Sequence, residues 1–232
     1  MSVKKYKSIV VSLKNPIDEL YAIEFKSLVG RYKYNPGQFL HLALDSDYDG
    51  SDQWPESRCF SMQSNPDDET IKITYAAKGR FTKEMERHLK VGSEVWLKLP
   101  YGDLFTQPHN KTNTVFIAGG TGITPFLSLF THKSFREYIN PHIYLGFRSK
   151  QHNIYETDLN FVQLRASFVQ LCDPLFFFED SGGPIDIRRI LHENGPESDY
   201  FISGPPGMIN SFKNYLKDAG VPLNQIKTDN WE

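Results

Sequence analysis

Apolar and polar residues alternate in short runs along the first hundred residues, which is the pattern of half-buried strands. Turn-forming pairs such as Asn15-Pro16 and Pro36-Gly37 separate these runs. The segment Thr82–Leu89 instead has helical spacing, and Thr82 suits its N-cap. The expected strands are Tyr6–Leu13, Leu20–Leu28, Phe39–Leu44, Arg58–Gln63, Thr70–Ala77 and Glu94–Leu99. Several short strands at regular spacing, with one helix, predict a small antiparallel β-barrel.

The second half of the chain has a different pattern, because strand-like apolar runs alternate there with segments of helical spacing. The expected strands are Val115–Ala118, His142–Phe147, Ser167–Leu171, Tyr200–Ser203 and Gln225–Lys227, and the expected helices are Pro125–Phe135, Tyr155–Leu164, Ile185–Glu193 and Pro206–Ala219. Such alternation predicts an α/β domain with a doubly wound parallel sheet. The change falls at the polar run Gln107–Lys111, which we interpret as a linker. We therefore expect two domains, residues 1–106 and 112–232.

The composition fits a globular protein, since 39% of the 232 residues are hydrophobic and 23% are charged. A net charge of −2 gives no reason to expect a nucleic acid or an anionic membrane as a partner. No apolar run approaches the length of a membrane span, and the first residues lack the apolar core of a signal peptide. Cys59 and Cys172 cannot by themselves ligate an iron–sulfur cluster or a zinc ion, so no metal is expected. These features predict a reducing, cytoplasmic setting.

The segment Ala118–Pro125, which reads Ala-Gly-Gly-Thr-Gly-Ile-Thr-Pro, joins a buried strand to a helix. Without Cβ atoms, a phosphate can approach its backbone closely, and free N–H groups at the helix start face an anion. Pro125 suits the first helical position, which needs no N–H. The alternative is a tight glycine turn without a ligand. The spacing is neither G-x-G-x-x-G nor a Walker loop; the candidate binding residues are Gly119, Gly120, Thr121, Gly122, Thr124 and Pro125.

A second glycine-rich turn, Ser203–Met208, follows the fourth strand expected in this half. In open α/β sheets, ligands bind beyond the carboxyl ends of the strands, and both turns lie at that edge. Together they imply one extended ligand, such as a dinucleotide.

Two segments of the first half also carry candidate chemistry. In Arg58–Ser61, an arginine can pair with a phosphate, an aromatic ring can cover a planar ring, and a serine can bond a ring heteroatom. Alternation places Arg58 and Phe60 on one side of the strand and Ser61 on the other. In Lys78–Thr82, a glycine and a hydroxyl before a helix form a second possible phosphate seat. An ordinary edge strand and an ordinary helix cap are the alternatives.

These four segments, in this order, resemble the ferredoxin–NADP reductase superfamily, whose flavin motif reads Arg-x-Tyr/Phe-Ser. The resemblance covers nearly the whole chain and implies an antiparallel flavin-binding barrel followed by a nicotinamide-binding α/β domain. It also implies FAD as the bound cofactor and NADH or NADPH as the hydride donor.

The resemblance assigns roles by position. Phe60 would stack on the flavin ring, Ser61 would bond near its N5, and Trp231 would shield the face that nicotinamide must reach. Ser61, Ser203 and Asp229 would be the catalytic residues, although many members have cysteine in place of Ser203 and glutamate in place of Asp229. The remaining cofactor-binding residues would be Arg58, Lys78, Gly79, Phe81 and Thr82 for the flavin, and the Gly119 loop with Arg148, Asp173, Gly204, Pro205 and Met208 for the nicotinamide nucleotide.

The implied activity is that of an FAD-dependent NAD(P)H:acceptor oxidoreductase that passes electrons to an external acceptor. A ferredoxin, a flavodoxin or an oxygenase component would serve as that acceptor. The alternatives are a free flavin or ferric reductase, a non-catalytic flavin-binding redox sensor, and a plain structural α/β protein.

The sequence slightly favours NADH over NADPH. Asp173 follows the third strand expected in the α/β domain, where it would repel a 2′-phosphate and accept hydrogen bonds from a free ribose hydroxyl. Against this, Arg148, Ser149 and Lys150 follow the second strand and can bind a phosphate. An exposed lysine adds little, so we weigh the repulsion higher.

Overall fold

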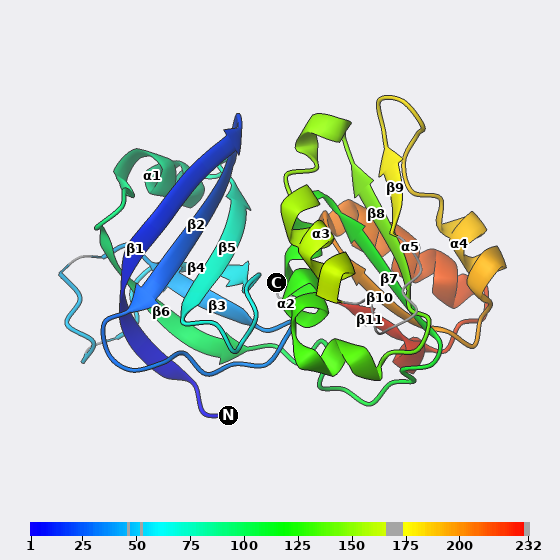
Figure 1. Ribbon diagram of the computed structural model, residues 1–232, viewed down its shortest axis with the longest axis horizontal. Coiled ribbons are helices and arrows are strands. Elements are labelled where there is room, and N and C mark those ends of the chain that lie inside the picture. Colours follow the sequence, from blue (N-terminus) through cyan, green and yellow to red (C-terminus); the bar gives the residue numbers. More distant parts are fainter. Residues whose placement is uncertain (46, 52, 166–173, 230–232) are drawn as a thin grey trace. The chain divides into compact units, whose positions relative to one another are not determined.

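The computed structural model describes residues 1–229 apart from 46, 52 and 166–173, and the chain divides into two compact units, Met1–Asp103 and Leu104–Glu232 (Figure 1). No helix in this described part is long and apolar enough to cross a membrane. Each unit has its own sheet and its own hydrophobic core.

The division between the units falls before the segment that we interpreted as a linker. Leu104 and Phe105 already pack into the core of the second unit. The backbone N–H of Asn110 donates a hydrogen bond of 2.6 Å to Asp199 of that unit. Asn110 of the polar run Gln107–Lys111 is therefore bonded to the second unit, and the two compact units divide after Asp103.

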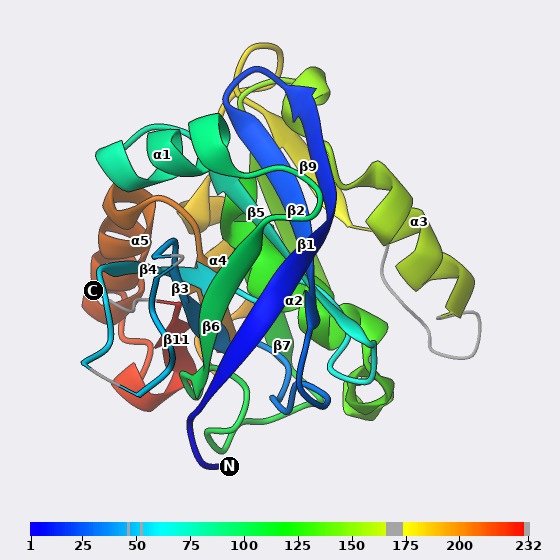
Figure 2. The same cartoon turned by 90° about the vertical axis from the view of Figure 1, so that its left-hand side faces the viewer.

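The first unit is a six-stranded antiparallel sheet in the order β4-β3-β6-β1-β2-β5, with α1 near one of its ends (Figure 2). After the edge strand β4, the N–H of Gln63 donates to the carbonyl of Lys72 in the other edge strand, β5, at 2.8 Å. This bond brings the two edges together, as in a barrel. The elements are β1 (Lys4–Ile17), β2 (Leu20–Ser27), β3 (Phe39–Ala43), β4 (Ser57–Ser61), β5 (Thr70–Ala76), α1 (Arg80–His88) and β6 (Glu94–Tyr101).

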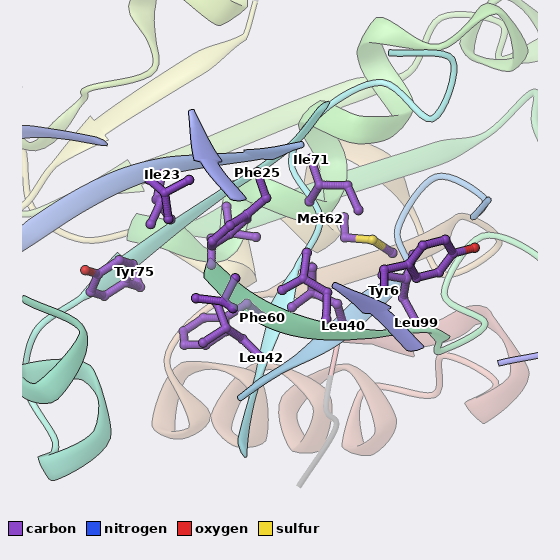
Figure 3. Close-up of a cluster of buried hydrophobic side chains, with 14 of the residues drawn as sticks. Tyr6, Ile23, Phe25, Leu40, Leu42, Phe60, Met62, Ile71, Tyr75 and Leu99 are labelled. Atoms are coloured by element: carbon purple, nitrogen blue, oxygen red, sulfur yellow. The ribbon is translucent and has the colours of Figure 1, made fainter. Parts of the chain in front are cut away.

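Alternate residues of these strands build the core of the first unit. Ile23 and Phe25 of β2 and Leu40 and Leu42 of β3 are fully buried, each pair two residues apart as a pleated strand requires (Figure 3). Phe60 of β4 joins the same cluster. The alternating pattern in the sequence is thus the inward face of the sheet.

The second unit is a five-stranded parallel sheet in the order β11-β10-β7-β8-β9, which confirms the α/β prediction. Helices α2 and α3 pack on one face and α4 and α5 on the other (Figure 1). The strands are β7 (Thr114–Gly119), β8 (His142–Phe147), β9 (Leu175–Phe178), β10 (Asp199–Ser203) and β11 (Ile226–Thr228), and the α-helices are α2 (Thr124–Thr131), α3 (Glu156–Arg165), α4 (Ile187–Asn194) and α5 (Pro206–Asp218). Short 3₁₀ turns are η1 (Gly120–Ile123), η2 (Lys133–Glu137), η3 (Lys150–His152) and η4 (Leu223–Gln225).

The structure describes one strand at a run that was not predicted to be a strand. The expected strand Ser167–Leu171 falls on residues outside the described part, and β9 is formed by the next apolar run, Leu175–Phe178. Both runs are short and apolar, and periodicity alone cannot choose between such runs. Residues 172–174 therefore precede β9 in the chain, whereas the prediction placed them after the third strand.

Candidate functional site

The Gly119 loop is a 3₁₀ turn set between a strand and a helix. β7 ends at Gly119, η1 follows, and α2 begins at Thr124. Pro125 is therefore the second helical residue, whereas the sequence predicted that it would be the first. The N–H groups of both positions have no acceptor inside the helix, so proline is tolerated at either. The hydroxyl of Thr124 donates to the carbonyl of Thr121 at 2.9 Å and ties the turn to the helix.

Three glycines allow this loop to pack against the turn that follows β10. A Cβ on Gly122 would lie 2.5 Å from the backbone of Gly204, and a Cβ on Gly204 would lie 3.0 Å from the N of Gly119. A Cβ on Gly119 would lie 2.8 Å from the sulfur of Met208. The two glycine-rich turns therefore form one structure, and close packing between them accounts for these glycines.

Gly120 has a different environment. Its φ is +55°, a conformation that favours glycine, and a Cβ there would meet no atom within 4 Å. The loop is therefore open on the side that Gly120 faces. Among the described residues, a ligand can therefore approach the backbone of this loop at Gly120.

The two turns lie at the switch point of the parallel sheet. β7 and β10 are neighbours, and the chain extends from β7 to β8 and β9 on one side and from β10 to β11 on the other (Figure 1). In open α/β sheets, ligands bind outside the carboxyl ends of the strands at such a point. The Gly119 loop follows β7 and the Gly204 turn follows β10, so both lie at this edge of the sheet.

The structure brings together two of the predicted catalytic residues, Ser203 and Asp229. Ser203 ends β10, and Asp229 directly follows β11, the neighbouring parallel strand. The serine hydroxyl donates a hydrogen bond of 3.1 Å to Oδ2 of Asp229, and the Asp229 N–H donates to the carbonyl of Ile202. Ser203 is buried and Asp229 half-buried, so a carboxylate is held beside the Gly204 turn.

Other predicted residues of this unit are separate or lie outside the described part. Arg148 is exposed after β8, and its carbonyl accepts the N–H of Asp180, which follows β9, at 3.1 Å. Asp173 and Trp231 lie outside the described residues. The acidic residues that follow β9 (Leu175–Phe178) are Glu179 and Asp180, and the role assigned to Asp173 stays a prediction.

In the first unit, the members of the predicted flavin motif have unequal exposure. Arg58 is exposed, and its guanidinium carbon lies 5.4 Å from the centre of the Phe81 ring. Phe60 is 8% exposed and lies edge-on to Tyr75 in the core, and Ser61 is 7% exposed. Arg58 is thus the motif side chain that a soluble ligand can reach directly, and the stacking role of Phe60 stays a prediction.

The predicted cap of the first helix is one turn too late. α1 begins at Arg80 with Gly79 as its N-cap, and Thr82 is the third helical residue. The hydroxyl of Thr82 accepts a hydrogen bond of 3.0 Å from the N–H of Gly79. A threonine near the start of a helix can play this role or that of the N-cap, and the sequence pattern alone does not tell which. Lys78 is exposed before this turn, and Phe81 is buried beneath Arg58.

Comparison with known proteins supplies relatives over most of the chain, although no protein-family model matches it. It is 26% identical over 219 residues to the reductase component of propane 2-monooxygenase from Mycolicibacterium smegmatis, covering 87% of this chain and 60% of that protein. It is 24% identical over 234 residues to the ferredoxin–NAD(P)+ reductase component of the naphthalene 1,2-dioxygenase system from Pseudomonas putida, covering 96% and 68%. A ferredoxin NADP+ reductase from Neisseria gonorrhoeae, solved with bound FAD and NADP, matches with a TM-score of 0.76 at 19% identity, over 99% of both chains.

These matches confirm the resemblance to the ferredoxin–NADP reductase superfamily. The shared fold is the two-domain arrangement of an antiparallel and a parallel sheet. The chain spans 55–60% of the length of the first curated relatives that it matches.

Arg80 and Glu56 were not assigned a role from the sequence. Arg80 donates a hydrogen bond of 2.5 Å to Glu56, which raises the pKa of Arg80 above its usual value. Glu56 also lies 3.4 Å from Arg58, so it connects the two segments that the superfamily uses for flavin. The sequence signal that could have indicated Arg80 is its position: it is a cation that directly follows Gly79 at the start of a helix.

The loop before β4 has the spacing Asp45-x-Asp47-x-Asp49-Gly50-x₅-Glu56, which is typical of calcium loops. No three His, Cys, Asp or Glu side chains in the described part lie close enough to hold a metal ion. We assign no metal there.

Proposed function

We propose that the chain is an FAD-dependent NAD(P)H:acceptor oxidoreductase. The observation that carries the proposal is the packing of the Gly119 loop on the Gly204 turn at the switch point, with Ser203 and Asp229 beside them. This arrangement suits an extended dinucleotide. The names of its relatives, which are reductase components and ferredoxin–NAD(P)+ reductases, support the same activity.

The first unit has groups that fit the phosphates of FAD. Arg58 and Arg80 place two guanidinium groups at the start of α1, where the free N–H groups of the first turn also favour an anion. Gly79 and Thr82 would hold the same phosphates. When bound, FAD would supply the chemistry of hydride acceptance and of onward electron transfer.

The second unit would bind and orient the nicotinamide nucleotide. Backbone groups of the open Gly120 turn would hold its pyrophosphate, since a Cβ on Gly120 would meet no described atom within 4 Å. The Ser203 hydroxyl, fixed by Asp229, would orient the nicotinamide ring. The contribution of these residues to the rate is proximity and orientation.

The acceptor would be an external redox protein, such as a ferredoxin or an oxygenase component, as the relatives' names suggest. A cytoplasmic location belongs to the same proposal.

The test starts from the absorbance spectrum of the purified chain, which we expect to be yellow and to release FAD on heating. Anaerobic titration with NADH and NADPH should then bleach the flavin band, and NAD(P)H should reduce a generic dye in the steady state. A colourless protein that FAD does not reconstitute would remove the proposal. Flavin binding without dye reduction would indicate a sensor, and efficient reduction of free flavin or ferric chelates alone would indicate a small-molecule reductase.

A further inference from the structure

One oxygen of the Glu56 side chain contacts two arginines of the first unit. Oε1 lies 2.5 Å from Nη2 of Arg80 and 3.4 Å from Nη2 of Arg58. The carboxylate of Glu84, one turn along α1, lies 3.7 Å from Nη1 of Arg80. The chain's own carboxylates therefore neutralise this pair of guanidinium groups.

Both arginines belong to the segments for which we propose a flavin-phosphate role. The Arg58 guanidinium also lies over the ring of Phe81, which limits the directions that it can take. Arg80 is the first residue of α1, and helix geometry leaves the N–H groups of the first turn without intrahelical acceptors. The two guanidinium groups that favour a phosphate here thus hold a carboxylate instead.

We propose that Glu56 competes with the flavin pyrophosphate for Arg58 and Arg80 and thereby sets the affinity for FAD. This inference rests on the proposed function. The Glu56, Arg58 and Arg80 side chains are 48%, 53% and 69% exposed, so water and salt weaken their contacts. A pyrophosphate carries more charge and accepts more hydrogen bonds than one carboxylate, so it displaces Glu56 when it binds.

The experiment measures FAD affinity of the full chain after flavin removal, in the presence of EDTA, for the wild type and for Glu56→Gln. The variant keeps the size of the side chain and removes its charge. We expect it to bind FAD about 3- to 10-fold more tightly at low salt, the effect of removing one or two exposed ion-pair contacts. At about 1 M NaCl the gain should fall below about twofold, because salt screens exposed pairs.

Two further variants separate competition from general effects. Glu94→Gln makes the same charge change in the same unit, at a glutamate that is 50% exposed and lies 2.8 Å from Lys7. Its FAD affinity should equal that of the wild type. In an Arg80→Ala background, Glu56→Gln should give less than about half of its gain, because one of its two partners is absent.

The possible outcomes are distinct. If neither the wild type nor any variant binds FAD, the proposed function fails and this inference fails with it. If the wild type binds FAD but Glu56→Gln binds it equally or more weakly, the function stands and the competition is wrong. An equal gain in Glu94→Gln would also overturn the competition, since the effect would then be one of net charge.

Discussion

The hydroxyl of Ser203 donates a hydrogen bond of 3.1 Å to Oδ2 of Asp229. The two residues lie at the carboxyl ends of β10 and β11, which pair in parallel through Ile202 and Thr228. The bond therefore depends on the register of the last strand of the sheet. It fixes both polar groups at the edge where the glycine-rich turns meet.

Replacing Ser203 by alanine tests this relationship. Hydrogen bonds to charged groups contribute about 1.5–3 kcal/mol, so kcat/KM for the nicotinamide donor should fall about tenfold or more. Flavin content should not change, because Ser203 belongs to the second unit. Steady-state kinetics with a dye acceptor and the flavin absorbance measure both quantities.

The matched control is Ser198→Ala. Ser198 is also a fully buried serine, but it lies just before β10, and its hydroxyl donates to the carbonyl of Asn194 at 2.7 Å. This variant should lose stability while keeping kcat/KM. An equal loss of kcat/KM in both variants would mean that the effect of Ser203→Ala is structural.

Gly122→Ala should disrupt the nucleotide site through sterics. Its Cβ would lie 2.5 Å from the backbone of Gly204, so the two turns must separate. We expect a loss of about 1–3 kcal/mol of stability, the usual cost of overpacking, together with weaker nicotinamide binding. Gly207→Ala is the control, because a Cβ there meets nothing within 4 Å and alanine is the better helix former by about 1 kcal/mol. Urea unfolding and nicotinamide titration compare them, and equal behaviour of the two variants would contradict the packing argument.

Regular hydrophobic patterns allowed most elements to be predicted from the sequence. The strand expected at His142–Phe147, for example, has those bounds in the structure. Contacts between distant segments could not be predicted in the same way. The packing of Gly122 on Gly204 and the bond from Ser203 to Asp229 depend on strand order and register, which no local pattern encodes.

The site residues that the sequence did not yield have a similar explanation. Glu56 lies in an acidic loop without periodicity, so nothing in the sequence indicated that it contacts two arginines. The strand expected at Ser167–Leu171 lies outside the described residues, and the strand that the structure describes, β9, lies at Leu175–Phe178, so the acidic residues after it are Glu179 and Asp180.

The position of β9 offers a second residue that could select the donor. Asp180 follows β9, and its N–H bonds to the carbonyl of Arg148. A carboxylate there would disfavour a 2′-phosphate, so NADH should have the higher kcat/KM. Asp180→Arg should raise the ratio of kcat/KM for NADPH to kcat/KM for NADH by about tenfold, which corresponds to about 1.4 kcal/mol.

Asp218→Arg serves as the control for Asp180→Arg, since it makes the same charge change at an exposed residue at the end of α5. It should leave the ratio unchanged. A wild-type preference for NADPH of about tenfold or more would contradict the assignment and point to Arg148 and Lys150 as the phosphate-binding groups.

The ion pair between Lys227 and Asp199 is buried at the other end of β10. Their charged atoms lie 2.5 Å apart, and the side chains are 3% and 5% exposed. Lys227→Met should cost about 3–5 kcal/mol of unfolding free energy, because it leaves a buried carboxylate without its cation. The double variant Lys227→Met/Asp199→Asn should recover part of this loss, since the amide oxygen can still accept the N–H of Asn110. Urea unfolding measures both, and a double variant less stable than the single one would contradict the explanation.

His109 makes stability depend on pH through the hydrogen bonds of its neutral form. Nδ1 lies 2.7 Å from the carbonyl oxygen of Gln107, so it must carry the proton and donate. Nε2 lies 2.6 Å from the hydroxyl of Tyr138 and accepts from it. Burial raises the pKa of Tyr138, so this hydroxyl stays protonated.

Burial lowers the pKa of His109 below its ordinary value of 6.5; the hydrogen bond to the Gln107 carbonyl opposes this, and the charge of Lys227 lowers the pKa further. Between its folded-state pKa and 6.5, His109 binds a proton in the unfolded chain but not in the folded one, so the stability from neutral His109 is lost as the pH falls through its folded-state pKa. The urea midpoint should therefore rise as the pH is raised to 6.5 and just above it, and this rise should be smaller in His109→Gln. Burial also lowers the pKa of His41 in the first unit, so His41→Gln should remove a second, separate part of the rise. A pH dependence that persists unchanged in His109→Gln would assign it to other groups.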